Sequence, residues 1–67
     1  MSKIKKLAKI RREKGLTQIA LSIESGVPRV SISRYENGRV SPNVRILERL
    51  ANALGVSIDE LIDRKAG

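Results

Sequence analysis

Cysteine and histidine are absent from the sequence, and Tyr35 is the only aromatic residue among 67. The absence of cysteine excludes a disulfide framework. Because histidine is absent as well, the chain lacks the usual ligands of a structural zinc ion. With a single aromatic ring, the chain lacks the row of side chains on which single-stranded nucleic acids stack their bases. A domain of this length must therefore draw its stability from an apolar core, well-capped helices and, in a dimer, a second copy of the chain.

Long apolar runs are missing as well. No segment approaches the roughly 20 apolar residues of a transmembrane helix, and no apolar stretch of a signal peptide follows the N-terminal lysines. We therefore expect a cytoplasmic protein without a membrane partner. Groups that carry catalysis are also scarce, because neither a glycine-rich phosphate loop nor a pair of carboxylates compensates for the missing cysteine and histidine. We expect no enzyme activity, no cofactor, no metal and no small-molecule ligand.

Basic residues are abundant but unevenly distributed. The formal net charge is +7. Residues 1–39 contain ten lysines and arginines against three acidic residues, whereas residues 40–67 contain four of each. This asymmetry favours a polyanionic partner, with nucleic acid ahead of an acidic membrane. The alternative is a solvated, solubilising surface, which a run of charge alone would favour, so the placement of individual side chains has to separate the two.

Caps, glycines and apolar stripes predict one domain, residues 1–67, built from five short helices. These are expected from Ser2 to Lys14, from Thr17 to Ser25, from Pro28 to Glu36, from Ser41–Pro42 to Leu54, and in a short turn after Ser57. The inward stripe of the fourth helix is expected to consist of Val44, Leu47, Leu50, Ala51 and Leu54. No segment alternates convincingly with a period of two residues, so the predicted fold class is all-α.

The third helix presents two arginines on one face. At about 100° per residue, one arc carries four outward residues, and apolar Ile32 lies on the opposite side. The four residues are Arg29, Val30, Ser33 and Arg34. An arginine can donate two hydrogen bonds to guanine O6 and N7, and a small apolar side chain can contact the thymine methyl group. We therefore predict base contacts in the major groove, with contact to phosphate or water alone as the alternative.

The preceding helix begins at a position suited to a phosphate. Thr17 is expected to cap it, and Gln18 follows at its N-terminus, where free N–H groups and the positive end of the helix dipole attract anions. Gln18 can hydrogen-bond a phosphate oxygen and also brace the third helix. A simple cap with a solvent-exposed Gln18 is the alternative.

The segments EKGLTQIALSIESGVPRVSISRYENG and SPNVRILERLANALGVSIDELI resemble the phage-repressor/Cro type of helix-turn-helix regulator, also called XRE-like. The resemblance extends from Leu7 to Ile62 and includes the spacing of GLTQ, GV, SISRYENG and LANALGVS. It implies a compact five-helix bundle of the lambda-repressor-like kind, in which the second and third helices form the helix-turn-helix.

The resemblance also implies roles for individual residues. A recognition helix at about residues 28–36 would enter the major groove. Phosphate contacts would come from Gln18, Ser31, Asn37, Gly38, Arg39 and Asn43, in addition to Thr17. Arg11 and Glu36 match a family pair that forms a partly buried ion pair between the first helix and the end of the third. Arg11 would therefore be structural, although it lies in the basic half of the chain.

Three features depart from the family pattern. Pro28 stands where a Ser or Thr cap is usual, which removes one cap hydrogen bond but stiffens the turn. Ser22 stands where a small alanine usually packs between the two helices. Ile19 and Ile23 occupy positions that are often charged. We expect these two isoleucines in the core or at its rim, whereas exposure would favour a protein partner.

Regulators of this kind place two recognition helices about one DNA turn apart, so that the operator is nearly palindromic. The C-terminal part of the chain is rich in apolar residues, some of which must cover the core. We expect a homodimer interface from Leu54, Val56, Ile58, Leu61 and Ile62. A monomer whose fifth helix covers only its own core is the alternative.

Together these patterns predict a sequence-specific regulator of transcription that binds double-stranded DNA, of the repressor, Cro-like or restriction-modification-controller type. The competing prediction is an antitoxin-like or bridging protein-interaction module that uses the same fold.

Overall fold

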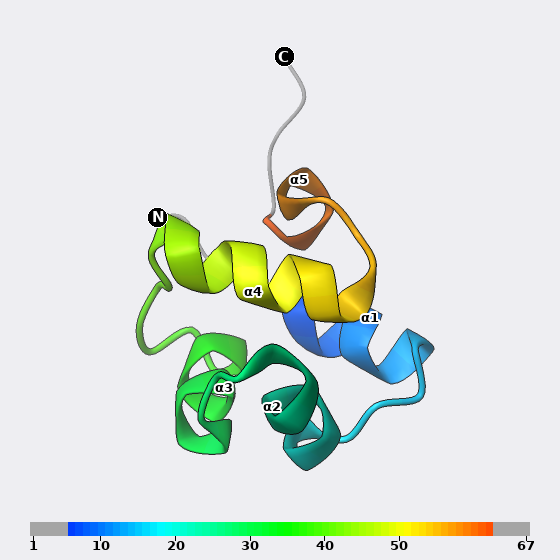
Figure 1. The fold of residues 1–67 in the computed structure, drawn as a ribbon. Helices are drawn as coiled ribbons and strands as arrows, with labels where there is room; N and C mark the ends of the chain where they lie inside the picture. Colours follow the sequence, from blue (N-terminus) through cyan, green and yellow to red (C-terminus); the bar gives the residue numbers. More distant parts are fainter. Residues whose placement is uncertain (1–5, 63–67) are drawn as a thin grey trace.

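The computed structural model describes residues 6–62, and within this range the chain forms five α-helices and no strand (Figure 1). The helices are α1 (Leu7–Glu13), α2 (Gln18–Ser25), α3 (Arg29–Glu36), α4 (Val44–Leu54) and α5 (Ile58–Leu61). The predicted all-α, five-helix fold is confirmed. The expected helix start at Ser2 lies outside the described residues.

Side-chain caps fix the first residues of three helices, α2, α4 and α5. Thr17 Oγ1 accepts a hydrogen bond from the Ala20 N–H at 3.0 Å, as predicted. Ser57 and Glu60 form a capping box, in which each side chain accepts a hydrogen bond from the other residue's backbone N–H. The N–H groups of a helix's first turn lack a carbonyl partner four residues earlier in the helix, so these caps provide acceptors for them.

The fourth helix begins later than predicted. We expected its start at Ser41–Pro42, but α4 begins at Val44 because Asn43 is its N-cap. Asn43 Oδ1 accepts from the Ile46 N–H at 2.9 Å, and this cap holds the Asn43 backbone in the extended conformation. Residues 41–43 are therefore a connecting segment and not the first turn of a helix.

The core lies between α4 and the other helices. Its buried members are Leu7, Leu21, Val27, Ile32, Leu50, Ala51, Leu54 and Leu61. α4 packs against both α2 and α5, α2 packs against α3, and α1 contacts α3. In Figure 1, α2 and α3 lie below α4 while α5 lies above it, so the two ends of the domain are different surfaces. Every helix contributes at least one core side chain.

Several apolar residues lie elsewhere than expected. Val44 was predicted to point inward but is 64% exposed, because the first turn of α4 extends past the edge of the core. Ile19 and Ile23 were predicted in the core or at its rim but are 60% and 77% exposed on α2. Leu54 and Leu61, which we expected at a dimer interface, are buried inside this chain and present no surface to a partner.

Among residues 6–62, no helix has both the length and the apolar character of a membrane span.

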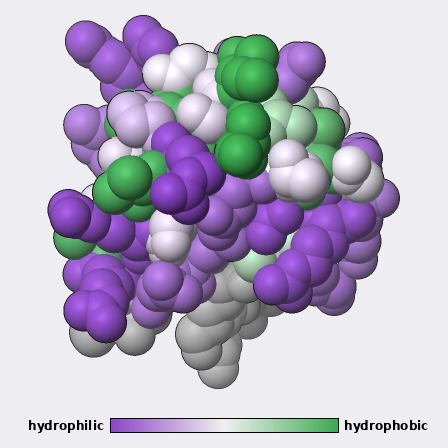
Figure 2. Space-filling view, turned by 90° about the horizontal axis from the view of Figure 1, so that it is seen from below, coloured by the Kyte–Doolittle hydropathy of each residue, from purple (hydrophilic) through white to green (hydrophobic). Residues whose placement is uncertain are grey.

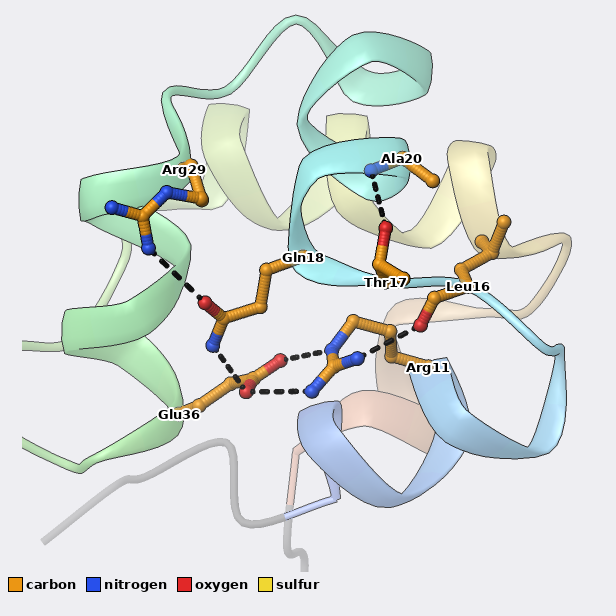
Figure 3. A network of polar contacts seen from close by, with 7 residues as sticks. All are labelled: Arg11, Leu16, Thr17, Gln18, Ala20, Arg29 and Glu36. Atoms are coloured by element: carbon orange, nitrogen blue, oxygen red, sulfur yellow. Dashed lines mark hydrogen bonds and ion pairs between the residues drawn. The ribbon is translucent and has the colours of Figure 1, made fainter.

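A buried ion pair joins α1 to the end of α3, as the family resemblance implied. Arg11 Nε donates to Glu36 Oε2 at 2.6 Å and Arg11 Nη2 donates to Glu36 Oε1 at 3.1 Å (Figure 3). Arg11 Nη1 donates to the Leu16 carbonyl oxygen at 2.8 Å. The two side chains are only 10% and 7% exposed. Such a desolvated pair is favourable only because each charge is matched by a partner and by hydrogen bonds.

Removal of one member of this pair is expected to destabilise the fold strongly. The Glu36→Ala variant would leave the Arg11 guanidinium buried without a counter-charge, and we expect the free energy of unfolding to fall by about 3 kcal/mol. Chemical denaturation monitored by circular dichroism measures this change. Glu24→Ala, which removes an exposed glutamate from α2, is the matched control and should change stability by less than about 0.5 kcal/mol. Equal effects of the two substitutions would contradict a structural role for the ion pair.

Candidate nucleic-acid interface

A tight turn connects α2 to α3 and sets the angle between them. Gly26 ends α2 in the left-handed conformation, with φ of 74°, and Pro28 is the N-cap of α3. Ser25 Oγ donates to the Leu21 carbonyl oxygen at 2.7 Å and accepts from the Val27 N–H at 3.2 Å. Val27 is buried in the core. The turn is therefore anchored by both hydrogen bonds and packing, although Pro28 provides no side-chain cap, as expected.

The Arg49 side chain of α4 reaches close to this turn. A Cβ atom on Gly26 would lie 3.3 Å from Arg49 Nη1, the flexible end of that side chain, which would have to shift slightly. The positive φ of Gly26 independently disfavours any other residue at this position.

The third helix is oriented as the helical spacing predicted. Ile32 is fully buried, and Tyr35 is half-buried against the core. Arg29, Val30 and Arg34 are exposed. The remaining two predicted contact residues, Ser31 and Ser33, are half-buried beside them. The helix is thus held by one side and displays two arginines and a valine on the other.

Figure 2 shows the molecule from below the view of Figure 1, the side on which α2 and α3 lie. Hydrophilic residues cover much of this surface, and separate apolar areas interrupt it (Figure 2). The exposed large apolar residues of α2 and α3 are Ile19, Ile23 and Val30. Ile19 and Ile23 are four residues apart and therefore lie on one face of α2.

The N-terminus of α2 lies beside α3 and has donors for an anion. The Thr17 cap uses the Ala20 N–H, which leaves the earlier N–H groups of the helix directed outward at the positive end of its dipole. Gln18 is half-buried. Its Nε2 donates to Glu36 Oε1 at 2.9 Å, and its Oε1 accepts from Arg29 Nη1 at a long 3.5 Å (Figure 3).

Gln18 therefore braces α3, as predicted, but through a partner that was not anticipated. Sequence reasoning paired Glu36 with Arg11 and did not connect it to Gln18. The two residues are 18 positions apart, and no helical periodicity relates positions in different helices. Their contact depends on the angle at which α2 and α3 cross.

The turn after α3 differs from the expected phosphate site. The N–H groups of Asn37, Gly38 and Arg39 donate to carbonyl oxygens of Ser33, Tyr35 and Arg34, respectively. These amides are used to end the helix, so Gly38, which has no side chain, does not offer the expected backbone donor. Asn37 and Arg39 are exposed and present their side chains. Asn43 is exposed as well, and its cap uses the side-chain oxygen but not the NH₂ group.

Comparisons with known proteins agree with this geometry. The family model described as helix-turn-helix matches residues 7–61. An uncharacterized HTH-type transcriptional regulator of Sinorhizobium fredii, y4dJ, is 49% identical over 55 residues, which are 82% of this chain and 71% of that protein. The cryptic phage CTXphi transcriptional repressor RstR of Vibrio cholerae is 40% identical over 61 residues, 91% of this chain but only 54% of the repressor.

A solved structure extends the likeness to the fold. The crystal structure of the restriction-modification controller protein C.AhdI from Aeromonas hydrophila matches with a TM-score of 0.81 and 32% identity. The match covers 85% of this chain and 86% of the controller. The sequence resemblance, the five-helix fold and the relatives agree, and the chain belongs to the helix-turn-helix family of DNA-binding transcriptional regulators.

Proposed function

We propose that the protein regulates transcription by binding a specific, near-palindromic operator in double-stranded DNA as a homodimer, with α3 in the major groove. The observation that carries this proposal is the two-sided character of α3. Ile32 anchors the helix in the core, while Arg29, Val30 and Arg34 are exposed on the other side. An exposed valine between two arginines fits base edges in a groove better than it fits open solvent.

Residues near α3 are proposed to fix its position on the duplex. Phosphate contacts hold a protein in register, and base contacts provide the sequence preference. We assign the positioning contacts to Thr17 and Gln18 at the start of α2, to Ser31, and to the side chains of Asn37, Arg39 and Asn43. Apart from Ser31, which lies within α3, these groups come before and after the recognition helix in the chain, as expected for contacts to the phosphates on either side of one groove.

The dimer is proposed to form through the end of the domain opposite α2 and α3. Val56, Ile58 and Ile62 are half-buried beside the core, so part of each apolar side chain remains available to a partner. α5 lies across α4 from the recognition helix (Figure 1), so a two-fold contact there leaves α3 uncovered in both copies. Two identical recognition helices require two inverted half-sites, which gives the operator its symmetry.

The type of regulator is proposed from the relatives. One is a phage repressor and one is a restriction-modification controller, and we propose a role of this repressor, Cro-like or controller kind. The second candidate function is a protein-interaction module of the antitoxin or bridging kind. The observation in its favour is the exposure of Ile19 and Ile23 on α2.

Selection of bound duplexes from a random DNA pool separates the two functions. We expect an enriched, two-fold symmetric motif with guanine in each half-site. The selection must be performed near physiological ionic strength, because at low salt a basic protein binds the phosphates of any DNA, whatever its sequence. Weak, salt-sensitive binding without enrichment would contradict the regulator and favour the protein-interaction module.

Arg34 is expected to provide sequence preference and not only affinity. The Arg34→Ala variant should lose about 1–3 kcal/mol of binding free energy for the selected site and become indifferent to one base pair. Competition binding against single-base variants of the motif measures both quantities. Arg12→Ala removes the same charge from the exposed surface of α1 and should leave the base preference unchanged. A uniform loss of affinity for every sequence in Arg34→Ala would show that Arg34 contacts only phosphate.

The dimer proposal is tested at Ile62. Ile62→Ser should raise the dimer dissociation constant about tenfold, equivalent to about 1.4 kcal/mol, because less apolar surface is removed from water on association. Sedimentation equilibrium measures the constant. Ile23→Ser makes the same chemical change on exposed α2 and should leave dimerisation unaffected. A wild-type protein that stays monomeric at high concentration and binds DNA as one copy would refute the homodimer.

A further inference from the structure

Asn37, the residue directly after α3, has a chemical property that the other asparagines lack. The chain contains three asparagines, and Asn37 is the one followed by glycine, whereas Asn43 and Asn52 precede valine and alanine. An asparagine side chain loses its amide group most readily before glycine, because glycine has no side chain to hinder the approach of its backbone nitrogen. Asn37 is exposed, as are residues 39–41 that follow, so water has access to this bond.

The reaction needs only groups of the chain and water. The backbone nitrogen of Gly38 loses its proton and attacks Asn37 Cγ, which forms a carbon–nitrogen bond and closes a succinimide ring. The side-chain nitrogen of Asn37 leaves as ammonia and takes up the proton. Water then opens the ring at one of its two carbonyl groups, which gives aspartate or isoaspartate. No oxidation, reduction or cofactor is involved.

The glycine that makes Asn37 reactive also ends α3. Gly38 has a φ of 74° and donates its N–H to the Tyr35 carbonyl oxygen at 3.1 Å. The Arg39 N–H donates to the Arg34 carbonyl oxygen at 3.0 Å. Together these hydrogen bonds form a Schellman motif, which requires the left-handed conformation that glycine adopts without strain. Because the Gly38 proton is held in a hydrogen bond, the reaction has to wait until the last turn of α3 opens locally.

We propose that Asn37 is a site of spontaneous deamidation, controlled by opening of the last turn of α3, and that this modification weakens DNA binding as the protein ages. The Asn37 side chain is assigned above to a phosphate contact, for which its NH₂ group is the donor. Aspartate and isoaspartate have no donor there and carry a negative charge, which a phosphate repels. The DNA consequence rests on the proposed function, whereas the modification itself does not.

Isoaspartate also changes the backbone. Its main chain runs through the former side-chain carbon, so one extra atom separates the Cα atom of residue 37 from the nitrogen of Gly38. The hydrogen bonds of Gly38 and Arg39 then no longer match the carbonyl groups of α3. The segment that carries the Arg39 side chain, a second assigned phosphate contact, is released from the end of the helix.

The first measurement is made without DNA. The folded wild-type protein is incubated at slightly alkaline pH, and mass spectrometry of its peptides follows the conversion of each amide to an acid, with enzymatic methylation to identify isoaspartate. We expect conversion at Asn37, while Asn43 and Asn52 keep their amides. A peptide of residues 33–42, which lacks the tertiary contacts, should convert at least about tenfold faster in the same buffer, because its Gly38 N–H is not held by a folded helix end.

Two results of this measurement would overturn the proposal. An intact Asn37 amide in the folded protein, over many half-lives of the peptide, would show that residue 37 is not a site of deamidation. Equal rates in the protein and the peptide would show that the end of α3 does not control the reaction.

The second measurement uses DNA. Asn37→Asp introduces one of the two products directly and should weaken binding at least about fivefold, for the selected operator and for unrelated duplexes alike, because phosphate contacts carry no base preference. Asn52→Asp makes the same chemical change at an exposed position of α4, outside the assigned contacts, and should keep the wild-type affinity. Equal affinities of the two variants would overturn the effect of the modification on DNA binding.

A time course connects the modification to the loss of binding. Asn37→Gln retains an amide, but its longer side chain would have to close a larger ring, which forms much more slowly. After incubation, the wild-type protein should bind DNA more weakly than before, whereas Asn37→Gln should keep its own starting affinity. An equal decline in both proteins would show that Asn37 is not the cause and overturn the proposal.

The measurements separate failure of this inference from failure of the proposed function. A wild-type protein that enriches no DNA motif would refute the proposed function and, with it, the DNA consequence of deamidation. Mass spectrometry would in that case still decide whether Asn37 is modified. A protein that enriches a motif but keeps the Asn37 amide, or binds equally well without it, would refute the inference alone.

Discussion

The buried ion pair between Arg11 and Glu36 is the interaction on which the arrangement of the helices depends. The eight core residues are apolar, and their packing has no directional preference. The core therefore holds the helices together but specifies the angles between them only weakly. Two charge-assisted hydrogen bonds between a guanidinium and a carboxylate have strict geometry. Because Glu36 is the last residue of α3, the pair fixes the end of the helix that displays the proposed recognition residues.

The two ends of the domain differ in how many side chains they contribute to the small core. α4 is central and contacts both α2 and α5, so no helix can be removed without exposing buried leucines. α5 has only four residues, and its Leu61 is completely buried. The half-buried residues around it are the ones assigned above to the proposed dimer contact. At the other end, α2 and α3 give few side chains to the core, and α3 presents Arg29 and Arg34 to solvent, which suits a surface that meets a polyanion.

The exposed pair Ile19 and Ile23 is the feature that the DNA-binding role does not explain. Single exposed apolar residues are common on protein surfaces, but these two lie one helical turn apart and form a short stripe. They are on α2, the helix that precedes α3. The stripe is small, and the rest of the surface of α2 is polar.

Local interactions account for most of what the sequence by itself determined. Helix starts at the Thr17 and Ser57 caps, and helix ends at the left-handed Gly26 and Gly55, depend on neighbours within a few residues. The number of helices, most of their boundaries and the outward face of α3 could therefore be predicted from spacing. The Arg11–Glu36 pair was predictable only through the family resemblance. The tertiary structure alone decided which apolar residues are covered: Leu54 and Leu61 are inside, whereas Ile19, Ile23 and Val44 are outside. It also created the contact of Gln18 with Glu36. The reason is that helical periodicity defines which residues share a face, while the crossing angles and offsets between helices define which part of that face meets another helix.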